Sequence, residues 1–190
     1  MKKIGIIHRE YEHFTLNKEL CKVLEENGIL VLGIVPNKFY KEAISLCDGI
    51  ILQGGKEYNG TDLEIVKYLW NNDIPTLGIC LGMQTMSVLF NGRLGHVENH
   101  YKIQKYVHNI RVNKKSKLYQ ILKEENLNVN SRHHDYVETT DLLICAMSDD
   151  SIIEAVEDPS RTFFIGVQWH PESTLDNDNI RLLDYFFSTL

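Results

Sequence analysis

The stretch "PTLGICLGMQTM", residues 75–86, places an apolar run, a glycine-flanked cysteine and a helical pattern in direct succession. The apolar run before Cys80 is typical of a buried strand, and Met86, Leu89 and Phe90 follow at helical spacing. Glycine tolerates the crowded backbone of a sharp turn, and two glycines flank the cysteine here. The stretch therefore predicts a strand–turn–helix unit, which is the building block of α/β proteins.

The first half of the chain repeats this alternation. The runs "KIGII", "ILVLGIV" and "GIILQGG" read as buried strands, and helical patterns lie around 16–24, 41–46 and 63–70. Continuous apolar strands that alternate with amphipathic helices indicate a parallel sheet covered on both faces. We therefore expect an α/β fold with a mostly parallel central sheet.

The second half is richer in strand patterns. The segments "YVHNIRV", "NLNVNS", "LLICAM", "SIIEAVE" and "TFFIGVQW" are strand-like, with turn signals such as "SDDS" and "EDPS" between them. Ile180, Leu183 and Phe187 then predict a C-terminal helix, and its aromatic residues Tyr185, Phe186 and Phe187 are expected to face the core. With no linker or repeat, residues 1–190 are expected to form a single domain with a β-rich C-terminal portion.

Composition excludes several classes of function. The net charge of −6 argues against nucleic-acid binding, and no apolar run approaches the ~20 residues that span a membrane. The start "MKKIGIIHRE" reads as a first strand rather than a signal peptide. Four cysteines without regular spacing indicate neither disulfides nor structural zinc, and His96 and His100 lack an evident third ligand. We expect a cytoplasmic protein with no metal site.

The cysteine at the turn fits a G-x-nucleophile-x-G elbow. "GICLG", residues 78–82, lies after a strand and before a helix, which is the context in which this pattern is meaningful. The sulfur of Cys80 would lie at a helix N-terminus, where unpaired N–H groups and the helix dipole stabilise a thiolate. The N–H of Leu81 would be free to hold a developing oxyanion. Cys80 is therefore a candidate nucleophile.

A candidate partner for the cysteine lies in "GVQWHPES", residues 166–173. A nucleophilic cysteine needs a histidine that a third group orients, and this segment offers both His170 and Glu172. Pro171 biases His170 toward extended backbone, in which residues i and i+2 point the same way. We therefore predict that Glu172 hydrogen-bonds one ring nitrogen of His170 and leaves the other for the cysteine.

Taken together, "GICLGMQ" and the downstream "QWHPE" resemble the class I glutamine amidotransferase superfamily and its Cys-His-Glu triad. The resemblance implies a flavodoxin-like three-layer sandwich. It further implies that Cys80 is the nucleophile, His170 the general base and then acid, and Glu172 the residue that orients the histidine. Such enzymes form a γ-glutamyl thioester from a γ-glutamyl amide and hydrolyse it to glutamate. They need no metal or organic cofactor for this step.

The resemblance also implies an oxyanion hole and a site for the glutamyl group. "LQGG", residues 52–55, corresponds to the glycine-rich loop whose backbone completes the oxyanion hole, so that Gly55, with Gly54 beside it, joins Leu81. "NVNSRHHDYV", residues 128–137, resembles the segment that holds the α-amino and α-carboxylate groups of the substrate. The residues expected to bind substrate are Gly54, Gln84, Ser131 and His133.

Within the superfamily, three functions remain open. The segment "SIIEAVEDPSRTFFIGVQWHPE" and Trp169, where amidotransferases usually carry Phe, resemble the bacterial γ-glutamyl-γ-aminobutyrate hydrolases of the peptidase C26 branch. The loops after "VLGIVP" and after "QGG" are shorter than in those hydrolases, which leaves the leaving amine undefined. A polyamine conjugate or a nucleotide phosphoramidate would fit as well.

The second function is a glutaminase subunit that delivers ammonia to a synthase partner. "YEHFTLN", residues 11–17, is similar to the N-terminal pattern of the anthranilate-synthase type, and 190 residues is a typical length for such subunits. The third is a binding protein without catalysis, against which the presence of all three triad residues argues. The expected partner is a small γ-glutamyl substrate, and the sequence leaves a homo-oligomer open.

Overall fold

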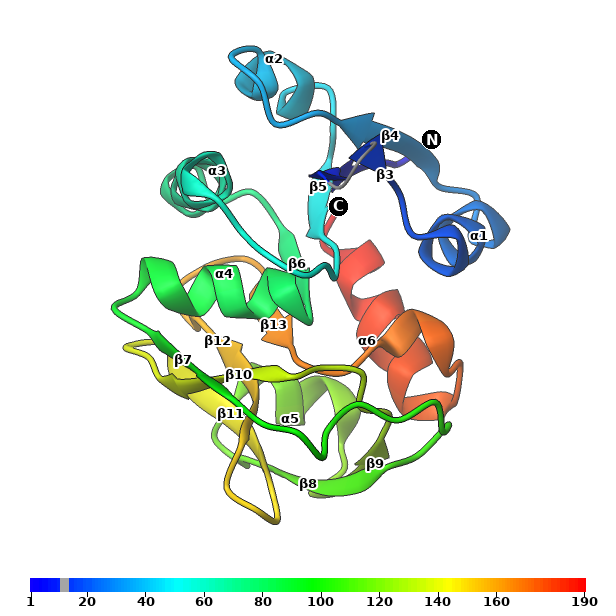
Figure 1. Cartoon of the computed structure of the whole chain (residues 1–190). Helices are drawn as coiled ribbons and strands as arrows, with labels where there is room; N and C mark the ends of the chain where they lie inside the picture. Colours follow the sequence, from blue (N-terminus) through cyan, green and yellow to red (C-terminus); the bar gives the residue numbers. More distant parts are fainter. Residues whose placement is uncertain (11–13) are drawn as a thin grey trace.

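The computed structural model describes residues 1–10 and 14–190, and Figure 1 shows how its elements are arranged. A mixed sheet of 11 strands runs through the molecule, with helices on both faces of its parallel part. The predicted α/β sandwich is therefore confirmed. The stretch "YEHFTLN" includes residues 11–13, which lie outside the described residues, so its likeness to one subunit type stays a prediction.

The parallel part contains five strands in the order β4-β1-β5-β6-β13. Every residue of β5, β6 and β13 is buried, because helices cover both faces of this part. The carboxyl ends of β5, β6 and β13 lie at one edge of the sheet, where α/β proteins bind ligands. The bounds of the five strands, in that order, are Leu30–Ile34, Lys3–Ile7, Gly49–Leu52, Thr76–Ile79 and Phe164–Val167.

The helices form two layers. One apolar core joins the sheet to α1, α5 and α6, and the other joins it to α2, α3 and α4 (Figure 1). Within the described residues, each helix is too short or too polar to cross a membrane. The helices α1 to α6 span Lys18–Glu26, Tyr40–Ile44, Gly60–Asn71, Leu81–Leu89, Lys117–Leu122 and Asn177–Ser188, and the 3₁₀ turn η1 spans Pro171–Ser173.

Antiparallel strands extend the sheet beyond β13. The order continues β12-β11-β8-β9, while β10 pairs with both β12 and β7. A separate pair, β2 and β3, lies near the N-terminus. The strands β12, β11, β8, β9, β10 and β7 span Ile153–Glu157, Leu143–Ser148, His108–Val112, Asn126–Val129, Asp135–Thr139 and Arg93–His96, and β2 and β3 span Arg9–Glu10 and Phe14–Thr15.

Two features differ from the prediction, namely three elements that were not expected and one face of α6. The patterns around β7, β10 and α5 were too short or too polar to read as elements, and these elements form because neighbouring strands and helices pair with them. In α6, Ile180 is 41% exposed and Tyr185 is 40% exposed, so the apolar face was placed wrongly at these residues. The predicted burial of Leu183, Phe186 and Phe187 is confirmed, and Leu182 joins them in the core.

Candidate active site

Cys80 lies at the turn between β6 and α4 in a strained backbone conformation. Its φ of 51° and ψ of −106° are unusual for a residue with a side chain, and Cys80 is the N-cap of α4. The Cys80 N–H donates to the Val167 carbonyl of β13 at 2.8 Å, and the Cys80 carbonyl accepts from the Gln84 N–H at 3.1 Å. These bonds hold the sulfur at the start of the helix, where the unpaired N–H groups favour an anion.

Gly82 explains how α4 can begin so close to the sheet. A Cβ placed on Gly82 would lie 2.0 Å from the Leu52 carbonyl oxygen of β5, which is backbone and cannot move aside. A Cβ on Gly78 would meet backbone atoms of Gly82 and Met83 at 2.9 Å. The two glycines predicted to relieve crowding at the turn therefore do so by allowing the helix to contact strands β5 and β6.

His170 and Glu172 lie just after β13, beside the turn that carries Cys80. The Nδ1 atom of His170 is 2.8 Å from Oε1 of Glu172, as predicted. His170 has extended backbone, but Glu172 belongs to the 3₁₀ turn η1, so the expectation of an extended segment through both residues was wrong. The contact forms because Pro171 begins a tight turn that brings the carboxylate back toward the ring.

The charge of His170 depends on its two neighbours. Burial disfavours the charged ring, but hydrogen bonds and attraction to Cys80 and Glu172 outweigh it and raise the pKa of His170 to about 10. An imidazolium beside a sulfur atom favours the thiolate form of the cysteine. The arrangement therefore places a proton donor beside the candidate nucleophile.

Three polar residues that the sequence analysis missed hold these groups in place. Asn17 Nδ2 donates to Glu172 Oε1 at 3.0 Å, and the Asn130 side chain bonds both the N–H and the carbonyl of His170 at 2.9 and 2.7 Å. Gln168 Nε2 lies 3.5 Å from Cys80 Sγ. Only Gln168 had a signal in the sequence, since it lies two residues before His170 in the motif "QWHPE".

The predicted oxyanion-hole residues lie together next to the cysteine. A Cβ on Gly54 would lie 2.9 Å from Cε1 of His170 and 3.6 Å from Cβ of Cys80. A Cβ on Gly55 would lie 2.8 Å from Cδ2 of Leu81. In the part of the chain that the structure describes, neither the Gly55 nor the Leu81 amide donates a hydrogen bond. Both N–H groups can therefore serve a ligand.

These residues open into a cavity of about 610 Å³, which is within the range of small-molecule sites. Two cationic side chains, Lys56 and Arg132, line it together with catalytic candidates, and the Nε atom of Arg132 is buried without a hydrogen-bond partner. The cavity is lined by Asn17, Gly54, Gly55, Lys56, Cys80, Gln84, Tyr101, Arg132, His133, His134, Asp135 and His170.

The substrate-binding predictions differ in outcome. Gly54, Gln84 and His133 line the cavity, but Gln84 Nε2 already donates to the Asp135 carbonyl at 2.7 Å and to Gln168 Oε1 at 3.1 Å. Ser131 is fully buried, and its hydroxyl donates to the His100 carbonyl at 2.5 Å, outside the cavity lining. Ser131 thus anchors the segment around His100, because the backbone there turns its hydroxyl away from the cavity.

His133 has a different electrostatic setting from His170. Its Nδ1 is 3.0 Å from the Asp135 carbonyl, and its Nε2 has no hydrogen-bond partner in the described chain. Burial, followed by repulsion from His100, lowers the pKa of His133 to about 3. At neutral pH this histidine is therefore an uncharged part of the cavity wall.

Comparison with known proteins places this geometry in context. A family model described as Peptidase C26 matches residues 57–172. The chain is 31% identical over 193 residues to anthranilate synthase component 2 of Cyanophora paradoxa, covering 95% of this chain and 96% of that protein. It is 32% identical over 148 residues to one subunit of the glutamine-hydrolyzing GMP synthase of Picrophilus torridus, covering 73% of this chain and 74% of that protein.

Two solved structures share the fold. The glutaminase domain of Trypanosoma brucei CTPS, solved with bound acivicin, has a TM-score of 0.78 at 19% identity and covers 100% of this chain and 93% of its own. A glutamine amidotransferase of Thermotoga maritima has a TM-score of 0.68 at 14% identity, and the match covers 98% of this chain and 83% of that chain. At these identities the likeness shows the fold alone.

Proposed function

This chain belongs to the Peptidase C26 family and is a glutamine amidotransferase-type glutaminase domain, and on that premise we propose that it is a cysteine-dependent hydrolase of γ-glutamyl amides. In this proposal Cys80, His170 and Glu172 form the catalytic triad. The observation that carries it is the placement of Cys80 at the N-terminus of α4 beside His170, whose Nδ1 lies 2.8 Å from Glu172. The products are glutamate and an amine.

The first half of the reaction forms a thioester. The Cys80 thiolate attacks the γ-carbonyl carbon, and the carbonyl oxygen becomes an oxyanion held by the N–H groups of Gly55 and Leu81. The C–N bond then breaks, and the leaving nitrogen takes its proton from His170. The raised pKa of His170, about 10, suits this step because the ring carries the proton at neutral pH.

The second half hydrolyses the thioester. The imidazole of His170, now neutral, takes a proton from a water molecule as that water attacks the thioester carbon. The C–S bond breaks, the thiolate of Cys80 re-forms beside the protonated ring, and glutamate leaves. Glu172 keeps the Nδ1 proton directed toward itself throughout, which leaves Nε2 for the reacting atoms.

The glutamyl end of the substrate has cationic and polar partners in the cavity wall. Arg132 has a buried Nε atom without a hydrogen-bond partner, while its Nη1 donates to Ser173 Oγ at 3.0 Å, and Lys56 is a second cationic side chain of the wall. A carboxylate matches the guanidinium best, because its two oxygens can accept two parallel hydrogen bonds. We assign the α-carboxylate to these residues and the rest of the wall near Gly54 and His133 to the glutamyl chain.

A second candidate is a glutaminase subunit that supplies ammonia to a synthase. The match to anthranilate synthase component 2 over 95% of this chain and 96% of that protein favours it. In addition, Tyr101 at the cavity and Ile103 on the same segment are 52% and 86% exposed. Exposed apolar side chains next to a site are typical of surfaces that meet a partner protein.

The deciding experiment is glutamate release by the purified chain alone. Glutamine is compared with γ-glutamyl amines, a γ-glutamyl polyamine and a γ-glutamyl phosphoramidate, with Cys80→Ser as the blank. Preferred turnover of one conjugate supports the hydrolase and identifies its amine. Slow turnover of glutamine only supports the second candidate, and affinity capture from the source cells is then the next step. Glutamate release that is equal in Cys80→Ser would contradict the proposed chemistry.

A further inference from the structure

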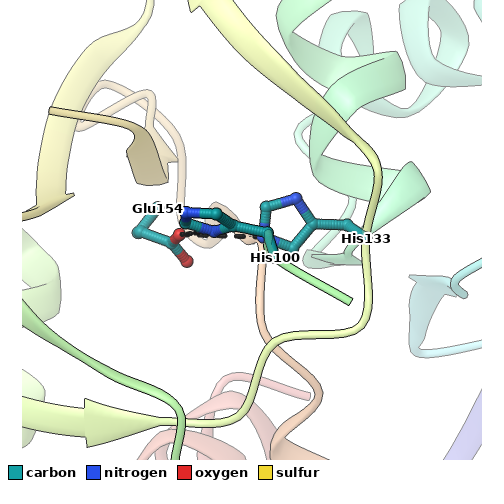
Figure 2. Close-up of side chains that lie close together, drawn as sticks. All are labelled: His100, His133 and Glu154. Carbon is teal, nitrogen blue, oxygen red and sulfur yellow. Dashed lines mark ion pairs between the residues drawn. The ribbon is translucent and has the colours of Figure 1, made fainter. Parts of the chain in front are cut away.

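A second group of titratable side chains lies behind the cavity wall. Figure 2 shows His100, from the segment after β7, His133, from the loop before β10, and Glu154, from β12, converging on one point. Each offers one ligand atom, and the three atoms lie within 4.8 Å of one another. The group brings together three segments that are far apart in the sequence and does not include Cys80 or His170.

The converging atoms are buried and unsatisfied. Glu154 is 0% exposed, and His100 and His133 are each 4% exposed. Glu154 Oε1 lies 3.9 Å from His100 Nδ1 and 3.8 Å from His133 Nε2, beyond hydrogen-bond distance. In the described structure neither ring nitrogen and neither oxygen of Glu154 has a hydrogen-bond partner. A buried carboxylate left in this state is costly unless a cation joins it.

The outward contacts of the two histidines turn their lone pairs toward Glu154. His133 Nδ1 is 3.0 Å from the Asp135 carbonyl, which can only accept, so Nδ1 carries the hydrogen and Nε2 the lone pair. His100 Nε2 is 2.7 Å from the Asp150 carboxylate, so in the neutral ring Nε2 carries the hydrogen and Nδ1 the lone pair. Metal-bound histidines donate their second N–H to a carbonyl or carboxylate in the same way.

We propose that His100 Nδ1, His133 Nε2 and the Glu154 carboxylate bind a divalent zinc ion. Two imidazoles and a carboxylate are a donor set that zinc accepts, and a tetrahedron with bonds of ~2.0–2.1 Å has edges of about 3.3–3.4 Å. The two observed edges to Glu154 require a contraction of about half an ångström. This assignment departs from the sequence expectation of no metal. His96, which the sequence pairs with His100, is exposed and contacts Asp135 instead.

A proton on a neighbouring histidine is the competing counter-charge. His108 Nε2, on β8, lies 3.1 Å from Glu154 Oε1, without the alignment of a hydrogen bond. If His108 carried the balancing charge alone, the cluster would bind no metal. If zinc binds, His108 is the nearest additional ligand, and water otherwise completes the coordination. The two cases differ in zinc uptake, which can be measured directly.

The experiment measures zinc binding to the full chain in a Cys80→Ser background, because the Cys80–His170 pair could itself take up zinc. The protein is stripped with chelator and titrated with Zn²⁺ by calorimetry, and its thermal midpoint is followed. We expect one equivalent per chain, a higher midpoint with zinc, and loss of both effects in His100→Ala and Glu154→Gln. His96→Ala is the matched control and should bind as the parent does.

Asp150→Asn provides a variant that leaves the core intact. The Asp150 side chain is 57% exposed, so its change should not affect folding, yet it orients His100. Loss of such an outer partner typically weakens metal binding about 10–100-fold.

Cobalt as a probe should show the visible absorption of a tetrahedral site in the parent and not in His100→Ala. Absence of zinc uptake in the parent, or unchanged affinity in both Asp150→Asn and His100→Ala, would overturn the proposal. Glutamate release plays no part in this test, so its outcome is independent of the proposed function.

Discussion

Two histidine–carboxylate groups lie next to the neighbouring strands β13 and β12, and they are built differently. After β13, His170 Nδ1 is 2.8 Å from Glu172, and Asn17 and Asn130 hold the pair. On β12, Glu154 lies 3.1–3.9 Å from three histidines and has no hydrogen bond among the described residues. A short, supported hydrogen bond suits proton transfer, whereas unpaired atoms at ligand spacing suit a cation. On this difference we propose chemistry for the first group and metal binding for the second.

The largest expected effect is the loss of glutamate release when Cys80, the candidate nucleophile beside the first group, is removed. Cys80→Ala should lower glutamate release at least about 10⁴-fold, because the thioester cannot form. Circular dichroism should show an unchanged fold. Cys47→Ala, which removes a half-buried cysteine elsewhere, is the control and should retain turnover. Normal turnover in Cys80→Ala would remove the basis for placing the chemistry at this group.

The next test concerns the histidine of the first group. His170→Asn should lower turnover about 10²–10⁴-fold, since it removes the general acid and base. It should also slow alkylation of Cys80 by iodoacetamide, because the imidazolium that favours the thiolate is lost. Mass spectrometry of the labelled peptide gives the rate. His96→Asn removes an exposed histidine and should react at the parental rate, and equal rates in all three proteins would refute the pairing.

A smaller effect is expected from the carboxylates that orient the two histidines. Glu172→Gln should lower kcat by less than His170→Asn, because the ring remains present but is less well oriented. Asp150→Asn makes the same chemical change at His100 and should leave kcat unchanged. Steady-state kinetics on the conjugate identified by the panel measures both. A similar loss in the two variants would show that the groups do not act separately.

The pH dependence should be the most gradual effect. His170 has a pKa of about 10 instead of 6.5, so it loses the proton that it donates to the leaving amine as the pH rises through about 10. Turnover should fall about tenfold per pH unit above that value. A raised pKa also means that the contribution of His170 to the free energy of unfolding is complete below about pH 6.5 and lost toward pH 10. Turnover is measured in a stopped assay and corrected for unfolding. If turnover begins to decline near neutral pH, the pKa of about 10 for His170 is contradicted.

Local sequence signals were sufficient for the parts of the site that depend on neighbouring residues. The glycines around Cys80 indicate a crowded turn, and His170, Pro171 and Glu172 lie within three positions. The apolar runs likewise indicate strands buried on both faces, because such strands need no alternation. Even here the backbone of Glu172 was misjudged, since a 3₁₀ turn and an extended segment can both bring it to His170.

Contacts between distant segments followed from the sheet order, which periodicity does not encode. Ser131 could be named as a substrate residue, but only the backbone around His100 shows that its hydroxyl is already used. Asn17 and Asn130 carry no local pattern that links them to Glu172 and His170. The sequence analysis did not name Glu154 as a metal ligand for the same reason, because Glu154 lies on a strand that is remote from His100 in the chain.

The sequence by itself determined the α/β class, the family and the candidate nucleophile with its histidine and carboxylate. These depend on hydrophobic pattern and on residues close together in the chain, where backbone sterics limit the options. Only the tertiary structure decided which residues support the candidate triad and which unpaired atoms gather around Glu154. Those groups meet through strand pairing and helix packing, which depend on the free energy of the whole fold rather than on any short segment.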